Sequence, residues 1–273
     1  MEKDKRMSIV VVSCDIYKDV VELYLKYLHL NWIDCPFEIF VATETYKPVD
    51  ETAKPIICGA DSTWTQRAIK AIEASQSPYV LLSVDDLFIS EKVETEEFTN
   101  ILNYIKKYDI KYYRIPIFIN KNQIFAEHPN NKNVQMIFDN QPYSVSIGTA
   151  IWEKNEILKI LGDGTKSAWD LENNFSVVDY TKSPKIMEGY VSDKRLLLHS
   201  VHMIKKGQWI PKGIKLMRKK GYLIEYRKRG LIPIKERIRP VVYDIGSRIC
   251  PTRFRAGVKK VFSKVGFKFA TKN

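Results

Sequence analysis

The stretch SPYVLLSVDD, residues 77–86, decides the fold. Its apolar part, 79–84, has the length and composition of a strand buried on both faces, and two aspartates follow at once. A second apolar run, SIVVVS at 8–13, ends in the same way at Cys14 and Asp15. Because strands buried on both faces occur mainly in parallel sheets, we expect both runs to lie in a mostly parallel sheet.

Segments with helical periodicity alternate with strand-like runs along the first 120 residues. Helices are expected at 20–30, 66–74 and 95–107, and further strands at 37–42, 55–58 and 111–119. This alternation predicts βαβ units and an open α/β sheet. The following Asn-rich stretch, NKNQIFAEHPNNKNVQ at 120–135, predicts a long loop that is mobile or faces an acceptor.

Polar residues follow the expected strands. In open α/β sheets ligands bind at the carboxyl ends of the strands, so these residues are the first candidates for substrate contacts. We expect such contacts from Ser13, Asp15, Glu44, Trp64, Thr65, Arg67 and Asp85. Arg67, on the helix after the third strand, has the geometry to bind phosphate with two parallel hydrogen bonds, although a surface ion pair explains it equally well.

Asp85 and Asp86 are the expected metal ligands. Two adjacent carboxylates after a buried strand are costly unless a positive group shares the site. Oxygen ligands suit Mg²⁺ or Mn²⁺, which bridge to a diphosphate and neutralise it as it leaves. The alternative is that the two acids cap the following turn.

Charge divides the chain into an acidic body and a basic end. Residues 1–204 carry 23 Lys and Arg against 29 Asp and Glu, a net −6, whereas residues 205–273 carry 21 against 3, a net +18. This asymmetry is typical of a domain with an attachment segment. We therefore expect a catalytic domain at 1–210 and a basic extension at 211–273.

The extension has an amphipathic pattern. Apolar residues recur at helical spacing along 256–269 and around Ile234, with lysines and arginines between them. This predicts helices that lie on an anionic membrane surface, although helices packed on the catalytic domain remain an alternative. The four cysteines form no paired motif and no stretch has the length of a membrane span, so we expect a cytoplasmic protein on the inner face of the cell membrane.

Four segments resemble bacterial GT-A glycosyltransferases of polysaccharide and cell-envelope glycan assembly. SPYVLLSVDDLFI at 77–89 is similar to their metal-binding motif, and GADSTWTQRAIKAIEAS at 59–75 to the segment beneath the nucleotide. PYSVSIGTAIWEKNEILKIL with SAWDLENNFS resembles the acceptor half, and VHMIKKGQW resembles a closing strand. The family's usual motif is Asp-x-Asp, whereas here the acids are adjacent, so which of them binds the metal directly is open.

The resemblance implies a GT-A fold, a nucleoside-diphosphate sugar donor, a divalent cation, and a glycan or lipid-linked glycan acceptor. For an inverting transfer, Glu172 is the expected base, Asp170 would orient a hydroxyl, and Trp169 would face a sugar ring. Related motifs often place the base one residue later, where this chain has Asn173, so a retaining mechanism stays open. Trp152, in the "iW" strand, is expected to contact substrate, and His202, near the closing strand, to be a third metal ligand.

Two other functions compete with this interpretation. A nucleotidyltransferase also uses a parallel sheet and strand-end acids, but usually has a Gly-rich loop after the first strand, where this chain has SCDIYKD. A nucleic-acid-binding protein would place the basic end on phosphates. The body is acidic and the aromatic residues of the end follow a helical stripe, so no nucleic-acid partner is expected. A homo-oligomer is left open.

Overall fold

A computed structural model describes residues 3–117, 123–225 and 228–234. The chain divides into two compact units, Met1–Met203 and Ile204–Asn273, which are described separately below. Most of the basic extension, including the apolar stripe at 256–269, lies outside the described residues.

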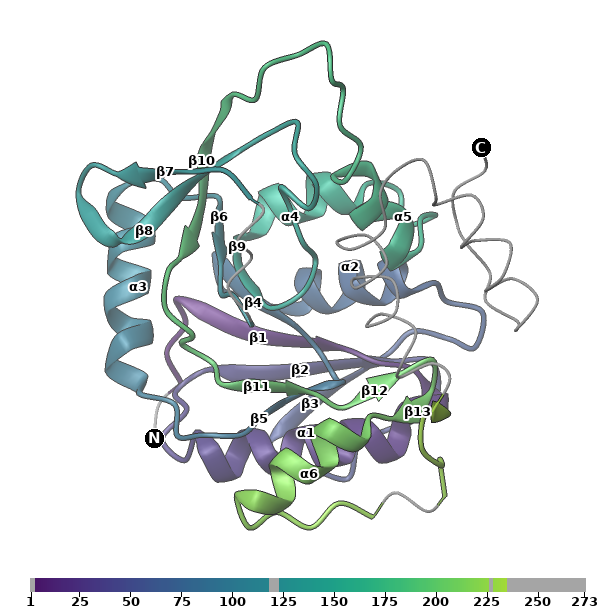
Figure 1. Cartoon of the computed structure of the whole chain (residues 1–273). Helices are drawn as coiled ribbons and strands as arrows, with labels where there is room; N and C mark the ends of the chain where they lie inside the picture. Colours follow the sequence, from purple (N-terminus) through teal and green to yellow (C-terminus); the bar gives the residue numbers. More distant parts are fainter. Residues whose placement is uncertain (1–2, 118–122, 226–227, 235–273) are drawn as a thin grey trace. The chain divides into compact units, whose positions relative to one another are not determined.

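A nine-stranded sheet forms the centre of the first unit, in the order β3-β2-β1-β4-β9-β6-β10-β8-β7 (Figure 1). The strands are β1 (Met7–Val12), β2 (Glu38–Thr43), β3 (Ala53–Ile57), β4 (Tyr79–Val84), β6 (Tyr112–Arg114), β7 (Phe125–His128), β8 (Asn131–Phe138), β9 (Ala150–Glu153) and β10 (Ile186–Asp193). A second, two-stranded sheet pairs β5 (Leu87–Ile89) with β11 (Ser200–His202) in antiparallel fashion.

The half of the large sheet formed by β3, β2, β1 and β4 is wholly parallel. In its centre Val12 lies opposite Ala42 on β2 and opposite Val84 on β4, so these three strands end level with one another. Both central strands are almost completely buried, as expected for strands covered on both faces. The residues that follow them therefore share one edge of the sheet.

The other half of the sheet is mixed. Strand β9 runs antiparallel to both β4 and β6, and β10 runs parallel to β6. The carboxyl ends of β6 and β10 consequently lie at the same edge as those of β1 and β4, together with the amino end of β9. The expected α/β fold class is confirmed, although only the first half of the sheet is wholly parallel and the second half combines the parallel pair β6–β10 with antiparallel pairs.

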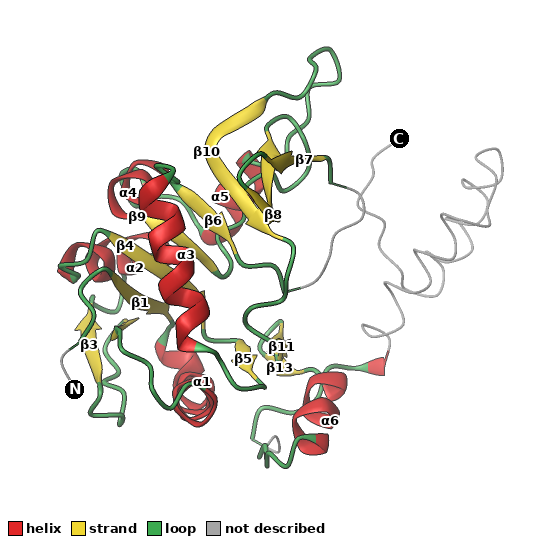
Figure 2. Cartoon of the chain, turned by 90° about the vertical axis from the view of Figure 1, so that its left-hand side faces the viewer, coloured by secondary structure: helices red, strands yellow, loops and turns green. Residues whose placement is uncertain are grey.

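Helices cover both faces of the sheet: η1 (Asp15–Tyr17), a 3-10 turn, leads into α1 (Lys18–Asn31), and α2 (Trp64–Ala74), α3 (Thr95–Lys107), α4 (Lys154–Leu161) and α5 (Ala168–Asn174) follow. In Figure 1, α1 lies below strands β1 to β3 and α2 above them; Figure 2 shows α3 in front of the sheet. The apolar side of α2, with Ala68, Ala71 and Ile72, packs on Val10 and Val12.

Helix α2 begins at a capping box. The Thr63 hydroxyl accepts a hydrogen bond from the Gln66 amide, and the Gln66 side chain accepts one from the Thr63 amide. These two bonds satisfy backbone donors that the first turn of a helix leaves unpaired. The start of α2 is thereby fixed beside the carboxyl ends of the parallel strands.

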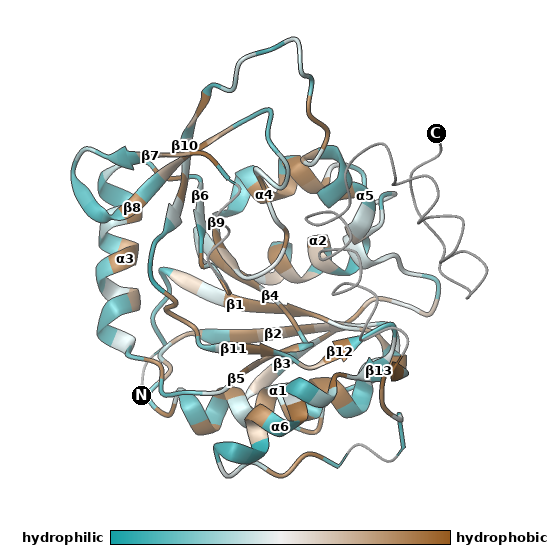
Figure 3. Cartoon of the chain, in the orientation of Figure 1, coloured by the Kyte–Doolittle hydropathy of each residue, from teal (hydrophilic) through white to brown (hydrophobic). Residues whose placement is uncertain are grey.

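The segment expected as a long loop at 120–135 is in part a β-hairpin, so that prediction is wrong. Strands β7 and β8 pair in antiparallel fashion around the turn His128-Pro129-Asn130-Asn131. Figure 3 shows hydrophobic colour along β1 and β2 and hydrophilic colour at the tip of this hairpin. On β8 Val134 and Ile137 are buried while the other side chains are partly or fully exposed, so the period-2 signal is weak.

The described part of the second unit contains a small hairpin and one helix. Strands β12 (Ile204–Lys205) and β13 (Gln208–Trp209) are joined by Lys206 and Gly207, both with positive φ, as a two-residue turn between strands of this twist requires. Helix α6 (Pro211–Lys219) has proline in its first turn and Arg218 and Lys219 in its last. Trp209 is buried, and its backbone bonds to Gly230 and Ile232.

Candidate functional site

Asp85 is held at the edge of the sheet by a serine from the neighbouring strand. The Ser13 hydroxyl donates to Asp85 Oδ2 at 2.5 Å, and both residues are buried. Close by, the Tyr24 hydroxyl donates to Ser83 at 2.9 Å, and burial raises the pKa of this tyrosine to about 12. Hydrogen bonds therefore link the end of β4 to the end of β1, through Asp85 and Ser13, and to α1, through Ser83 and Tyr24.

Asp86 lies beside a histidine that is distant in sequence. His202 Nε2 is 2.8 Å from Asp86 Oδ2, and the Met203 amide donates to the Asp86 carbonyl at 2.8 Å. The pairing of β11 with β5 causes this approach, since His202 lies opposite Leu87, the residue after Asp86. Both side chains are accessible, with 24% of Asp86 and 54% of His202 exposed. The structure therefore places Asp86 and His202 together and Asp85 beneath the surface.

The donor set at this point fits a divalent cation that substrate helps to hold. Among residues 3–117, 123–225 and 228–234, no group of three or more His, Cys, Asp or Glu side chains is placed to hold a metal ion. Mg²⁺ is commonly held by one or two carboxylates together with substrate phosphates and water, rather than by a complete protein cage. One accessible carboxylate beside one imidazole is compatible with that mode.

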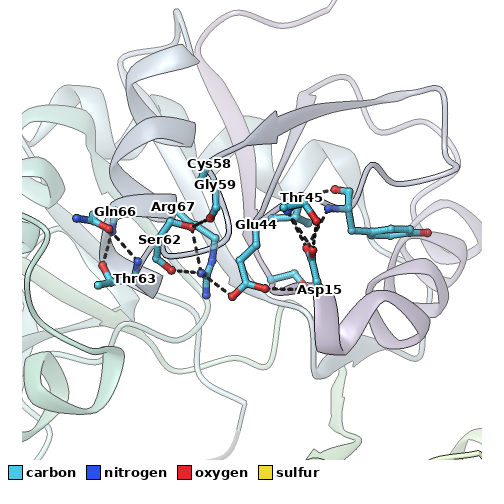
Figure 4. A network of polar contacts seen from close by, with 12 residues as sticks. Asp15, Glu44, Thr45, Cys58, Gly59, Ser62, Thr63, Gln66 and Arg67 are labelled. Carbon is cyan, nitrogen blue, oxygen red and sulfur yellow. Dashed lines mark hydrogen bonds and ion pairs between the residues drawn. The ribbon is translucent and has the colours of Figure 1, made fainter.

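Asp15, Glu44 and Arg67 form one polar network at the same edge (Figure 4). Arg67 Nη1 donates to Glu44 Oε1 at 3.1 Å, and the Asp15 amide donates to Glu44 Oε2 at 2.9 Å. Only 7% of the Arg67 side chain is exposed, so the surface ion pair considered from the sequence is in fact a buried one. The Asp15 carboxylate is occupied by the amides of Thr45 and Tyr46.

Cys14 shows how these charges surround the edge. Burial raises the pKa of the Cys14 thiol, and the negative charges of Asp85 and Glu44 raise it further, while Arg67 acts in the opposite direction. The end of β1 therefore lies within the field of both carboxylates and of the guanidinium.

The start of α2 is tied to the loop that precedes α5. Thr63 Oγ1 donates to the Gly164 carbonyl at 2.7 Å, and the Thr65 hydroxyl donates to the Lys166 carbonyl. Gly164 has φ +77°, and a Cβ there would lie 2.9 Å from the Gln66 side chain, so only glycine allows this approach. Thr65 is fully buried, which corrects its expected role as a substrate contact, whereas Trp64 is partly buried against the core.

A cavity of about 760 Å³ opens at the mixed half of the sheet. Its walls include Arg114 at the end of β6, Thr149 just before β9, Glu172 on α5 and Ser192 on β10. Because β9 is hydrogen-bonded to β4, with Ala150 opposite Leu82, Thr149 lies one strand away from the strand that leads to Asp85. The cavity and the Asp86–His202 pair thus belong to the same edge.

A chain of hydrogen bonds connects Glu172, which lines this cavity, to Arg114. Ser146 Oγ donates to Glu172 Oε1 at 3.0 Å, and the Tyr112 hydroxyl donates to the Ser146 carbonyl at 3.1 Å. The same tyrosine oxygen accepts a bond from Arg114 Nε at 3.2 Å. A chain of hydrogen bonds through the buried Tyr112 therefore connects the Glu172 carboxylate to the Arg114 guanidinium.

The remaining expected site residues are placed differently. Trp152 is fully buried against Tyr112, with ring centroids 4.2 Å apart, so its expected contact with substrate is wrong and it belongs to the core. Asp170 accepts hydrogen bonds from the Ser167 amide and hydroxyl and caps α5, which accounts for it without a substrate. Trp169 is 74% exposed on the same short helix.

Arg114, Ser146 and Thr149 were missed from the sequence. Arg114 falls inside the strand expected at 111–119, whereas the observed strand β6 ends at Arg114, so the rule of strand ends did not point to it. Ser146 and Thr149 stand in a polar loop whose sequence carries no comparable signal. Within the described residues, no helix has the length and apolar character needed to cross a membrane.

No protein-family model and no curated protein sequence matches this chain. Among solved structures, it is similar to the 2-C-methyl-D-erythritol 4-phosphate cytidylyltransferase of Thermus thermophilus, with 12% identity over 81% of this chain and 100% of the other, at a TM-score of 0.42. It is also similar to residues 1–349 of TarS from S. aureus, with 12% identity over 92% of this chain and 77% of the other (TM-score 0.40).

A third similar structure is the UTP-bound UGPase of Acinetobacter baumannii, with 9% identity over 81% of this chain and 94% of the other, at a TM-score of 0.45. Likenesses at this level carry no inference about the reaction. What the chain itself defines is an α/β domain with one polar edge, on which an accessible Asp–His pair and a cavity of about 760 Å³ both lie.

Proposed function

We propose that this protein is a metal-dependent glycosyltransferase, which moves a sugar from a nucleoside-diphosphate sugar to a glycan or lipid-linked glycan. The observation that carries the proposal is the common edge of the two halves of the sheet. The parallel half ends in Ser13, Asp85 and Asp86, and the mixed half ends in the cavity of about 760 Å³ that contains Glu172. A transferase that joins two substrates needs two neighbouring sites of this kind.

The parallel half suits the donor. Asp86 and His202 would hold Mn²⁺ or Mg²⁺, which when bound supplies positive charge to the departing diphosphate. Ser13 and Asp85 lie directly beneath, and the buried Arg67 and Glu44 line the ends of the neighbouring elements. We assign the nucleotide to this region because ligands of open α/β sheets bind at the carboxyl ends of the strands.

The cavity suits the acceptor. Its walls combine apolar side chains, such as Ile115 and Phe125, with a few polar groups, as is typical of small-molecule sites. Glu172 is accessible from it and is oriented by the Ser146 hydroxyl. We propose that Glu172 accepts the proton of the acceptor hydroxyl as that oxygen attacks the donor sugar, which is the step an inverting transfer requires.

The connection after β1 favours this assignment over a nucleotidyltransferase. Residues 13–17 contain no glycine, and the 3-10 turn η1 leads straight into α1. The amide of Asp15 is already bonded to Glu44, and the Asp15 carboxylate lies in the same turn. A negative turn of this kind does not offer the backbone cradle that a Gly-rich loop provides to a nucleoside triphosphate.

We further propose that the basic segment 205–273 attaches the enzyme to an anionic membrane surface. Its net charge of +18 supports this, because each basic residue near such a surface contributes about 1 kcal/mol. Sedimentation with vesicles that contain 30% phosphatidylserine, at low and high salt, tests the proposal against vesicles of phosphatidylcholine alone. Equal binding to both kinds of vesicle would contradict it.

A thermal-shift screen tests the glycosyltransferase assignment. UDP-, GDP-, CMP- and dTDP-sugars are each added with and without Mn²⁺ to the wild type and to Asp86→Asn. We expect one nucleotide class to raise the melting temperature only when Mn²⁺ and Asp86 are both present. Asp34→Asn, an exposed acid at the opposite edge of the sheet, is the matched control and should respond like the wild type. No response of the wild type to any nucleotide would contradict the assignment.

A further inference from the structure

Arg114 stands out in the cavity because its charge has no acidic partner. Nη1 donates to the Gln123 side chain at 2.8 Å, and Nη2 donates to the backbone carbonyls of Tyr143 and Ser144 at 2.8 and 2.5 Å. Nε donates to the Tyr112 hydroxyl, whose ring lies beneath the guanidinium. Every one of these acceptors is neutral, and among the residues that the structure describes no carboxylate forms an ion pair with Arg114.

Of the other charged side chains of the cavity wall, Lys194 and Asp193 are already in ion pairs, whereas Glu172 is bonded to a neutral partner. Lys194 Nζ lies 2.8 Å from Glu127, and the buried carboxylate of Asp193 bonds to Arg195 at 3.0 Å. Glu172 accepts a hydrogen bond from the Ser146 hydroxyl, and Ser146 and Tyr112 lie between Glu172 and Arg114 in the hydrogen-bonded chain. Within the described lining, the unbalanced cation is therefore Arg114.

A half-buried cation without an anion costs free energy unless a ligand supplies the opposite charge. Arginine carries five N–H groups, and here four hydrogen bonds to neighbouring acceptors hold the guanidinium in place, which leaves one N–H of Nη1 and the positive charge for an oxyanion. Preorganised donors of this type are favoured for binding carboxylate and phosphate.

A second group in the cavity is also ready for a ligand. Thr149 is only 7% exposed, and its hydroxyl has no hydrogen-bond partner within the described structure. Buried polar groups are normally paired, so the Thr149 hydroxyl can accept or donate a further hydrogen bond beside the cavity. Apolar side chains nearby, Ile115 and Phe125 among them, offer surface for the carbon face of a sugar ring.

We propose that the acceptor carries an oxyanion, a sugar carboxylate or phosphate, which Arg114 binds while a hydroxyl of the same molecule faces Glu172. This inference rests on the proposed function, since it names the substrate class of the acceptor cavity. The hydrogen-bonded chain from Arg114 through Tyr112 and Ser146 to Glu172 fixes the spacing of the two contacts. A neutral glycan would leave the guanidinium unbalanced.

Ligand titrations followed by saturation-transfer NMR test the proposal on the full chain. The probes are glucose, glucuronate and glucose 6-phosphate, in buffer with low salt. A hydrogen bond to a charged group is stronger than a neutral one, so we expect at least one charged sugar to bind about tenfold more tightly than glucose. The stronger of the two charged probes identifies the group as carboxylate or phosphate.

In Arg114→Gln the charged sugar should bind no more tightly than glucose. Arg6→Gln, which breaks the ion pair with Asp4 at the opposite edge of the sheet, should leave the preference unchanged. Arg114→Lys keeps the charge without the fork and should retain part of the preference, which provides a test should the glutamine variant fail to fold. Equal binding of glucose and both charged sugars to the wild type would overturn the proposal. The proposal would also be overturned if Arg114→Gln folds and keeps the full preference for charged sugars. If Arg114→Gln does not fold, full preference in Arg114→Lys would overturn it.

The thermal shift with nucleotide and Mn²⁺, measured on the same proteins, separates the two claims. If charged sugars depend on Arg114 while no nucleotide binds, the oxyanion site stands and the glycosyltransferase assignment fails. If a nucleotide binds with Mn²⁺ while Arg114→Gln binds charged sugars as the wild type does, the oxyanion site fails and the donor site stands.

Discussion

His202 lies 2.8 Å from Asp86, although 116 positions separate the two residues in the chain. The contact depends on a short antiparallel pair, β5 with β11, which begins directly after the two aspartates. Asp85, by contrast, is turned toward Ser13 and is buried. The two adjacent acids at the end of β4 therefore differ in environment: Asp85 is buried and Asp86 is accessible to solvent.

Replacing His202 with glutamine should weaken Mn²⁺ binding in the presence of UDP or the nucleotide that the screen identifies. A residue that binds or orients at a metal site typically changes metal affinity by about 10- to 100-fold. A Mn²⁺ titration monitored by the thermal shift measures the change. His199→Gln, in which the replaced histidine is paired with Glu91 instead, should behave as the wild type, and equal effects of the two variants would contradict the account.

Glu172→Gln and Asp170→Asn should differ sharply in activity, although the two residues are a half-turn apart on α5. Loss of a general base costs roughly 10²- to 10⁴-fold in kcat, whereas asparagine at 170 still accepts the capping bonds from Ser167. Donor consumption with a competent acceptor measures both variants. Full activity of Glu172→Gln would mean that Glu172 is not the base, and a loss confined to Asp170→Asn would transfer the role to that residue.

Glu44→Gln should destabilise the fold, because it leaves the Arg67 guanidinium buried without its carboxylate. Breaking a buried ion pair costs about 3 to 5 kcal/mol, and since a quarter of Glu44 is exposed we expect about 2 to 3 kcal/mol. Urea unfolding gives the value. Glu38→Gln, which breaks the exposed pair with Lys54, serves as the control and should cost less than about 1 kcal/mol. Equal losses would show that burial of Arg67 has no energetic consequence.

The cap of α5 predicts a pH effect of known sign. The hydrogen bond from the Ser167 side chain holds the pKa of Asp170 below its ordinary value of 3.8. The bond therefore adds stability that is fully present above that value and is lost as the pH falls through the lowered pKa of the folded state. In Ser167→Ala the pKa of Asp170, followed by carboxyl-carbon NMR, should rise toward 3.8. An unchanged pKa would contradict the cap.

The parallel half of the fold follows closely from the sequence. The strand at 79–84 and the helix at 95–107 are confirmed at both ends, since continuous apolar runs and strong helical periodicity define such elements locally. The β7–β8 hairpin does not follow from the sequence because most of its side chains are only partly buried, and its two buried residues, Val134 and Ile137, are three positions apart and give no alternation.

The candidate site, like the fold, could be predicted from the sequence only in part. Residues directly after predictable strands, such as Ser13 and Asp85, could be expected to lie together because parallel strands end at one edge. The wall formed by Arg114, Ser146 and Glu172 depends instead on contacts across the sheet that no local pattern encodes. Trp152 shows the converse error, because an aromatic residue in a strand fits the core as well as it fits a sugar site.

Electron paramagnetic resonance of Mn²⁺ tests the central claim most directly. The signal of free Mn²⁺ should fall when the protein and a nucleoside diphosphate are both present, and should remain with either one alone, because Asp86 and the diphosphate hold the ion together. Asp86→Asn should restore the free signal while Asp34→Asn should not. If Asp86→Asn binds Mn²⁺ and nucleotide as the wild type does, the cation site at the end of β4 is wrong.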